Sequence, residues 1–344
     1  MRGDWRWVWP LLGIASAFHV LVGGWAVVAA LLAWAATKER TSFIAMLPWL
    51  IAGGLLSLPG VVPGLLLTWN ADPETVELAN QIYVFDRLSH HLVIYDFPLR
   101  YKLQFAVVFI AWLVVCFFTR KQTAQQSLRL FVLGSIVIGV AGIVVDQATI
   151  HDPALSASLV RFYWYRLADM MVPLGLAFAL AEGAMLWEKS RPRWSQAALG
   201  TLIVLPTVVL SWHFAQQRAD PRPTADIQGH IGDDDPREHA EWLNTCAWIE
   251  ANTHPDARFL TPPNATSFRW YAQRSEVVSW KDIPQNAAGI VAWRERLRAT
   301  RGWWSTLRRE GISKALLQEL FALAGPSRYD FEYVIVSRSY DTSR

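Results

Sequence analysis

The sequence has little charge for its length, few cysteines and no long basic segment. Only 18% of its 344 residues are charged, against 53% that are hydrophobic, and the net charge is +3. The two cysteines, Cys116 and Cys246, offer neither a disulfide framework nor a metal-ligand spacing. No basic run or glycine-rich phosphate loop is present, which argues against a nucleic-acid partner. An ordinary soluble fold is therefore excluded for much of the chain.

The charges that are present are unevenly distributed. Residues 1–214 hold 27 of the 61 charged side chains, and the remaining 130 residues hold 34. Twelve of the 19 tryptophans also precede residue 215, and indole rings gather at bilayer boundaries. The sequence predicts a polytopic α-helical membrane region over 1–214, a linker over 215–235 and a small α/β soluble domain over 236–344.

Six apolar runs in the first region are long enough to cross a bilayer as helices. They are 8–36, 43–69, 103–119, 128–149, 167–187 and 195–214. The uncharged stretches that contain the first two, residues 7–37 and 41–71, are 31 residues each, more than one straight span requires. Because His19 and Gly23-Gly24 interrupt the first run, and three prolines interrupt the second, either is expected to be tilted, kinked or broken.

Basic side chains follow the first, third and fifth runs, and Lys or Arg near span ends marks the cytoplasmic side. The loops 70–102 and 149–166, and the C-terminal domain, are therefore expected to be extracytoplasmic in a multi-pass protein of the inner (cell) membrane. The first residues lack a signal-peptide pattern, so either the chain begins outside or it is part of a longer one. If the first run formed two segments, the side of the N-terminal residues would change.

After residue 235 the pattern becomes that of a mixed α/β domain. A helix is expected from Pro236 to about residue 252, with others over 287–300 and 313–323. Short strands are expected over 258–261, 276–280 and 331–336. Strands separated by helices predict three layers around a small sheet.

The loop 70–102 contains the first group of candidate functional residues. Asp72 followed by Pro73 predicts a helix start. If that helix continues to about residue 92, Asp86 and His90 share one face, and Arg87 and His91 share the next. Such a face could bind a phosphate headgroup or a divalent metal. The alternative is a hydrogen bond between Asp86 and His90 on an amphipathic helix without a ligand.

The loop 149–166 contains the second group. Arg161 and Arg166 flank an aromatic stretch, and Asp169 follows Arg166 at a spacing that suits an ion pair. These residues predict either a structural pair beneath an aromatic belt or arginines that face a lipid-linked phosphate. Of the other acids in the spans, Asp146 is expected near the outer loops, and Glu182 is expected to snorkel or to pack between helices.

The soluble domain contains a third group, dense in aromatic and charged residues. It includes Trp270, Tyr271, Arg274, Lys281 and Asp282. The charged members are candidates to line a cleft, and the two aromatic side chains are candidates to dock the domain onto the membrane region. Packing in the domain core is the alternative for the aromatic pair.

Three stretches carry a resemblance to known proteins: DRLSHHLVIYDFP (86–98), RFYWYRLADMMVPLGLAF (161–178) and WIEANTHPDARFLTPPNATSFRWYAQRSEVVSWKDIPQNA (248–287). They resemble an uncharacterised family of bacterial multi-pass membrane proteins with a C-terminal domain of unknown function. More distantly, the chain resembles the C-terminal part of C-superfamily glycosyltransferases, which use polyprenyl-phosphate sugars. In those enzymes the catalytic acid follows the first span, and no residue of this sequence matches it.

The resemblance implies a glycosyltransferase-like protein that handles a lipid-linked sugar at the outer membrane face. His90, His91, Arg161 and Arg166 would then bind the carrier phosphates, with Asp86 as the nearby candidate base. No organic cofactor is implied. A non-catalytic envelope scaffold is the first alternative. A transporter is the second, and it would need polar groups at mid-membrane depth on broken helices.

Overall fold

The computed structural model describes residues 5–38, 40–67, 69–119, 125–190, 236–262, 265–323 and 329–336, with isolated positions between 197 and 215. The chain forms two compact units. The helical unit is Met1–Leu205 with Asn286–Ala288, and the C-terminal unit is Pro206–Gln285 with Gly289–Arg344. Most of the sixth predicted span, and the predicted linker after residue 215, lie outside the described residues.

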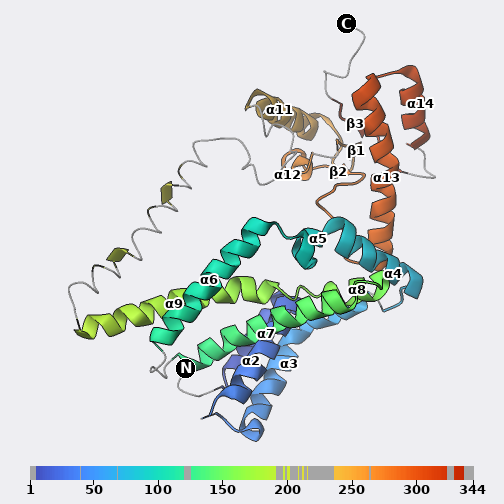
Figure 1. The fold of residues 1–344 in the computed structure, drawn as a ribbon. Helices are drawn as coiled ribbons and strands as arrows, with labels where there is room; N and C mark the ends of the chain where they lie inside the picture. The colour runs from blue at the N-terminus through green and yellow to red at the C-terminus, as the bar shows by residue number, and fades with distance from the viewer. Residues whose placement is uncertain are drawn as a thin grey trace. The chain divides into compact units, whose positions relative to one another are not determined.

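Four helices of the described chain are long and apolar enough to cross a membrane. They are α3 (Phe43–Leu66), α6 (Leu99–Phe118), α7 (Gln126–Ala148) and α9 (Arg166–Ser190), the last over Arg166–Leu186 (Figure 1). They coincide with the second to fifth predicted spans. The three prolines of the second run lie inside α3, which continues through them.

The first apolar run is broken, one of the outcomes that its interruptions predict. It forms α1 (Val8–Phe18) and α2 (Val20–Ala36), separated at His19. The His19 backbone is extended, with φ −146° and ψ 91°, and its side chain accepts a hydrogen bond from the Val22 N–H at 3.4 Å. His19 therefore ends one helix and caps the next.

Helices α1 and α2 form an antiparallel hairpin. Trp5 and Trp9, at the start of α1, share a buried cluster with Ala30 and Ala33, near the end of α2, and with Met46 of α3. The start of α1 thus lies at the same end of the unit as the end of α2. This is the two-segment outcome of the first run, in which the start of α1 lies at the end of the unit opposite to the one that a single span would give it.

Close backbone contacts between small residues hold the hairpin against α3. A Cβ atom added to Gly53 would lie 2.5 Å from the Trp9 carbonyl oxygen, and one added to Gly13 would lie 2.1 Å from that of Gly53. Within the hairpin, a Cβ on Gly23 would lie 2.4 Å from the Ser16 Cα. Such small-residue interfaces let helices approach closely where water provides no driving force for association.

The remaining long helices continue the assembly from the other side of α2. Contacts follow the order α3, α1, α2, α7, α9 and α6. Ala26 and Ala29 of α2 pack with Ile138 of α7, and Val132 of α7 packs with Trp112 of α6. Most of the buried positions of α7, such as Ser135 and Gly142, carry small or branched side chains and recur at helical spacing.

Short elements gather at one end of the helical unit, called here the loop-rich end (residues 70–98 and 149–165). They are α4 (Pro73–Gln81), a π-helical turn η1 (Ile82–Arg87), α5 (Ser89–Leu92), a 3-10 turn η2 (Ile94–Asp96) and α8 (Pro153–Val160). Val84 and Leu92 pack with Ala157 and Val160 in one buried cluster. This cluster fixes the first loop against the second.

The C-terminal unit contains a small parallel sheet. Its elements are α11 (Pro236–Asn252), β1 (Arg258–Leu260), α12 (Phe268–Ala272), β2 (Ser275–Glu276), α13 (Ala287–Glu310), α14 (Lys314–Leu323) and β3 (Tyr333–Val334). The strand order is β2-β1-β3, and both pairings are parallel. The three predicted strands are present but shorter, and α13 continues ten residues beyond its predicted end.

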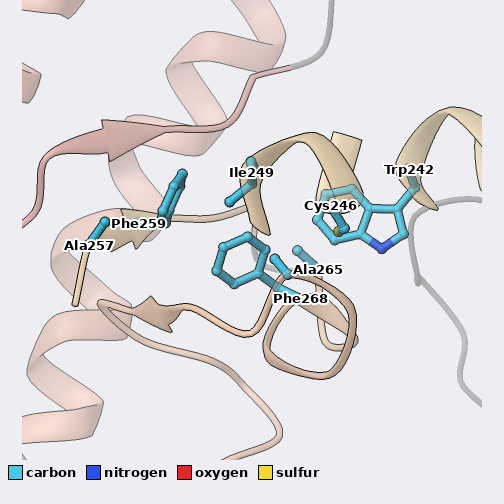
Figure 2. Close-up of a cluster of buried hydrophobic side chains, with 8 residues drawn as sticks. Trp242, Cys246, Ile249, Ala257, Phe259, Ala265 and Phe268 are labelled. Carbon is cyan, nitrogen blue, oxygen red and sulfur yellow. The ribbon is translucent and has the colours of Figure 1, made fainter. Parts of the chain in front are cut away.

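Two cores cover the two faces of this sheet. Phe259 packs with Trp242, Ile249 and Phe268, which come from α11 and α12 (Figure 2). The next residue, Leu260, packs in a second cluster with side chains of α13 and α14. Since successive strand residues face opposite sides, the predicted three-layer arrangement is present (Figure 1).

Candidate functional site

The helix predicted from residue 72 to about 92 is interrupted where its candidate residues lie. Its start is confirmed, because Asp72 accepts a hydrogen bond from the Thr75 N–H at 3.0 Å. In η1, however, the Leu88 N–H donates to the Tyr83 carbonyl, five residues earlier, at 3.0 Å. Leu88 then leaves the helical conformation, with φ −125° and ψ 19°.

This interruption makes the spacing argument for Asp86 and His90 wrong. A π-helical turn takes up more residues than an α-turn and shifts the angular position of those that follow. Asp86 belongs to η1, whereas His90 belongs to α5, beyond the break at Leu88. The charge of Asp96 in η2 acts on His90.

The two histidines form the centre of a cationic group, called here the Arg/His cluster (Arg87, His90, His91 and Arg166). The rings of His90 and His91 are in contact, with centroids 4.1 Å apart. Burial lowers the pKa of His91, and the charges of His90, Arg166 and Arg87 lower it further. Burial and Arg87 also lower the pKa of His90, against the opposing effect of Asp96. The structure thus places two of the predicted phosphate-binding residues in contact, with a third, Arg166, and also Arg87 near enough for their charges to act on His91.

Arg161 lies in a neighbouring group rather than in the Arg/His cluster. Its guanidinium donates to the side-chain oxygen of Asn80 on α4. The hydroxyl groups of Tyr83 and Tyr163 lie 3.2 Å apart, and burial raises the pKa of Tyr83 well above its usual range. The charges of both Arg161 and Arg87 act on Tyr83, so Arg87 connects the two groups.

An acid at the end of α7 lies beneath these loops. Asp146 is only 5% exposed and accepts a hydrogen bond from the Ile94 N–H of η2. Its Oδ2 atom is buried and has no hydrogen-bond partner within the described chain, and the same holds for the Tyr165 hydroxyl. Burial and the Asp146 charge raise the pKa of Tyr165 above its usual range. Asp146 is close to the loop 70–102, as predicted from its place in the sequence.

The side chains at the loop-rich end are better suited to binding a phosphate group than a metal ion. Within the described ranges, no three His, Cys, Asp or Glu side chains gather as a metal site would require. The Arg/His cluster instead presents hydrogen-bond donors from three separate elements. Guanidinium and imidazolium groups are suited to oxyanions, with charge-assisted and often bidentate hydrogen bonds.

The third group of candidates, in the C-terminal unit, does not form one site. Arg274 is buried and donates to the carbonyl oxygens of Glu250 at 2.6 Å and Thr253 at 2.8 Å, at the end of α11. Its side chain thus caps the C-terminal end of α11, where the last carbonyl groups have no partner within the helix. Asp282 accepts from Arg269 at 3.2 Å, while Lys281 is exposed.

The core interpretation of the two aromatic candidates is wrong. Trp270 is 77% exposed and Tyr271 is 38% exposed. Helix α12 has five residues, and its buried face is taken by Phe268 and Ala272, which stand four residues apart. The residues between them must therefore face outward.

The comparisons with known proteins concern this C-terminal unit. Residues 240–300 match a domain of unknown function (DUF6798). The DUF6798 match runs from α11 into α13 and includes Glu276 and Asp282. Nothing among curated proteins or solved structures matches the chain. The protein thus combines a domain of unknown function with four apolar helices of membrane-spanning length.

Proposed function

We propose that the loop-rich end of the helical unit binds the phosphate group of a membrane lipid, a polyprenyl phosphate with or without its sugar. The observation that carries the proposal is the Arg/His cluster. Arg87 comes from η1, the histidines from α5 and Arg166 from the start of α9, and their charges converge on His91.

The electrostatics of the cluster favour an anion. Burial lowers the pKa of both histidines first, and the neighbouring positive charges lower it further, because each positive group makes it harder for its neighbours to carry a charge. A phosphate would offset this repulsion and accept hydrogen bonds from guanidinium and imidazolium together.

The position of the cluster favours a lipid as the carrier of that anion. Arg166 begins a helix long enough to span a bilayer, so a phosphate bound beside it would lie at headgroup depth. The helices α2, α6 and α9 end in sequence segments rich in Lys and Arg. By the positive-inside rule those ends face the cytoplasm, and the loop-rich end faces outward.

A more specific form of the proposal is that the protein transfers a sugar from the lipid. It rests on the distant resemblance to C-superfamily glycosyltransferases. This transfer requires a base that removes a proton from an acceptor hydroxyl. Asp86 is the candidate from the sequence, and Asp96, whose charge acts on His90, is the second. Both side chains are exposed on the loop-rich end.

A non-catalytic scaffold is the second candidate function, favoured by one observation. Arg161 is bonded to Asn80, and Tyr83 meets Tyr163. These contacts tie the two loops together, as a purely structural surface would. Lipid binding that is unaffected by loss of the cluster charges would support the scaffold.

Arg166→Gln is expected to weaken binding of a polyprenyl phosphate at least tenfold. A hydrogen bond to a charged group contributes about 1.5–3 kcal/mol, and ~1.4 kcal/mol corresponds to tenfold in affinity. Binding of the lipid to the full chain in nanodiscs would be measured. Arg161→Gln is expected to have a smaller effect, because Asn80 already accepts from Arg161.

Arg100→Gln provides the matched control. Arg100 is an exposed arginine at the start of α6, where its guanidinium lies over the Tyr101 ring, 4.5 Å from the centroid. Its replacement removes the same charge from the unit and is expected to leave the affinity unchanged. Equal affinities for the Arg166→Gln and wild-type proteins would overturn the proposal.

Lipid binding is also expected to depend on pH through the histidines. Because their pKa values are lowered without ligand, both are neutral near pH 7, and a bound phosphate favours their protonated forms. Binding therefore takes up protons, and this contribution to affinity grows as the pH falls from 7.5 to 5.5.

Protonation of the phosphate itself, with a pKa of about 6, weakens binding in the same interval. The informative quantity is therefore the ratio of affinities between the wild-type protein and a His90→Gln/His91→Gln variant. This ratio is expected to rise several-fold as the pH falls, and a constant ratio would show that the histidines do not contact the phosphate.

A further inference from the structure

The C-terminal unit contains a pocket of about 250 Å³, and of the charged residues predicted to line a cleft, Asp282 is part of its wall. Its lining includes Arg258, Arg269, Glu276, Asp282, Trp293 and Arg296. They come from β1, α12, β2, the segment after β2 and α13. The pocket lies within one unit, and it is independent of the loop-rich end.

A buried carboxylate anchors one wall of the pocket. The Glu276 side chain is 2% exposed and accepts from the Arg269 Nε at 3.1 Å. Its second oxygen accepts from the Thr261 hydroxyl at 2.7 Å. Burial raises the pKa of Glu276, against the lowering effects of Thr261 and Arg269. Arg269 also contacts Asp282 at 3.2 Å, so three charged groups are held in place before any ligand arrives.

Two further arginines face the same space without a carboxylate of their own. Within the residues that the structure describes, the Arg258 and Arg296 side chains form no ion pair or hydrogen bond. Arg269 is occupied by two acids, so Arg258 and Arg296 are the cations left for a ligand. Guanidinium groups of this kind bind carboxylate and phosphate oxygens.

The rest of the pocket lining can bind the hydroxyl groups of a ligand and contact the apolar face of a ring. Asp282 and Asp330 present carboxylate oxygens, which accept hydrogen bonds from hydroxyl groups. The half-buried ring of Tyr329 supplies apolar surface, and Trp293, which is 3% exposed, forms part of the pocket wall. Trp293 is fixed because its indole N–H donates to the Ser279 carbonyl at 2.8 Å. The volume lies below the ~300–1,000 Å³ of pockets for drug-sized ligands, which limits the occupant to about one sugar ring.

We propose that this pocket binds a small hydroxylated anion, namely a sugar that carries a carboxylate or a phosphate group. Arg258 and Arg296 bind the anionic group, the carboxylates of Asp282 and Asp330 accept from the ring hydroxyls, and Tyr329 supports the ring. Because the site is separate from the Arg/His cluster, it stands whether or not the loop-rich end binds lipid.

The proposal is tested by titrating the full chain in detergent with four probes, using isothermal calorimetry. Glucuronate and glucose 6-phosphate distinguish the two sources of the anion, and binding of either supports the proposal. Glucose lacks the anionic group, and inorganic phosphate lacks the sugar ring with its hydroxyl groups. Both are expected to bind at least tenfold more weakly. Phosphate that binds as tightly as both sugar anions would overturn the role of the hydroxyl groups.

Variants assign the binding to this pocket. Arg258→Gln and Arg296→Gln are each expected to weaken binding of the sugar anion at least tenfold. Arg298→Gln, an exposed arginine on the same helix outside the pocket, is expected to leave it unchanged. Arg166→Gln, in the Arg/His cluster, is also expected to leave it unchanged. Wild-type affinity in both pocket variants, or no binding of either sugar anion, would overturn the proposal.

Discussion

Replacing Gly53 with alanine is expected to lower the free energy of unfolding of the helical unit by about 2–3 kcal/mol, in the upper range for overpacking. The added methyl group would lie 2.5 Å from the Trp9 carbonyl oxygen and 2.8 Å from its carbonyl carbon. Backbone atoms cannot rotate away as a side chain can, so α1 and α3 must move apart. That movement would also strain the contact from the Trp9 indole N–H to the Met46 sulfur, now 3.3 Å.

Gly54 supplies the control, because it is the adjacent residue of the same helix and has nothing within 4 Å of an added Cβ. Alanine exceeds glycine in helix propensity by about 0.8–1 kcal/mol. Gly54→Ala is therefore expected to leave stability unchanged or raise it. The apparent melting temperature of the purified protein would be compared, with a fall of about 5–10 °C for Gly53→Ala. Equal melting temperatures would show that α1 does not pack on α3 in this way.

Alanine substitutions at Gly23 and Gly24 provide the same comparison within the α1–α2 hairpin. An added Cβ on Gly23 would overlap the backbone of Ser16, whereas one on Gly24 meets nothing within 4 Å. Alanine at the two positions is therefore expected to have opposite effects on stability, which a single continuous first helix would not produce.

The long helices were predictable from the sequence because length and apolarity alone define them. The hairpin was not, because the same interruption at His19 and Gly23 suits a kink as well as a reversal. The choice depends on the contact of Gly23 with Ser16 and of Gly53 with Trp9, and such contacts appear only when the helices are assembled.

The candidate site, too, was predictable from the sequence only in part. The sequence places Arg166 and both histidines in loops on one predicted side, and the structure brings them together. The π-helical turn before His90 has no sequence signal of its own. It accompanies the packing of Val84 and Leu92 against α8. Arg258 and Arg296 are far apart in the sequence, so their shared pocket follows from the sheet and helix packing alone.

Replacing Glu182 of α9 with alanine is expected to destabilise the helical unit strongly. Its carboxylate is 8% exposed and pairs with Arg129 of α7, which is 14% exposed. Arg129 also donates to the Thr119 hydroxyl, at the end of α6, at 2.7 Å. The pair therefore joins three helices, which confirms the helix-packing role predicted for Glu182.

Glu182→Ala would leave the Arg129 guanidinium buried without its counter-charge. Breaking a buried pair in this way costs about 3–5 kcal/mol, chiefly because the remaining charge stays away from water. Thermal unfolding of the purified protein would measure the loss. The Arg129→Met/Glu182→Leu variant removes both charges and fills the space with apolar atoms of similar volume, so it is expected to recover most of the lost stability. If the single and double variants were equally destabilised, the role of the pair would be shape rather than charge. Wild-type stability in Glu182→Ala would mean that water or lipid headgroups already solvate Arg129.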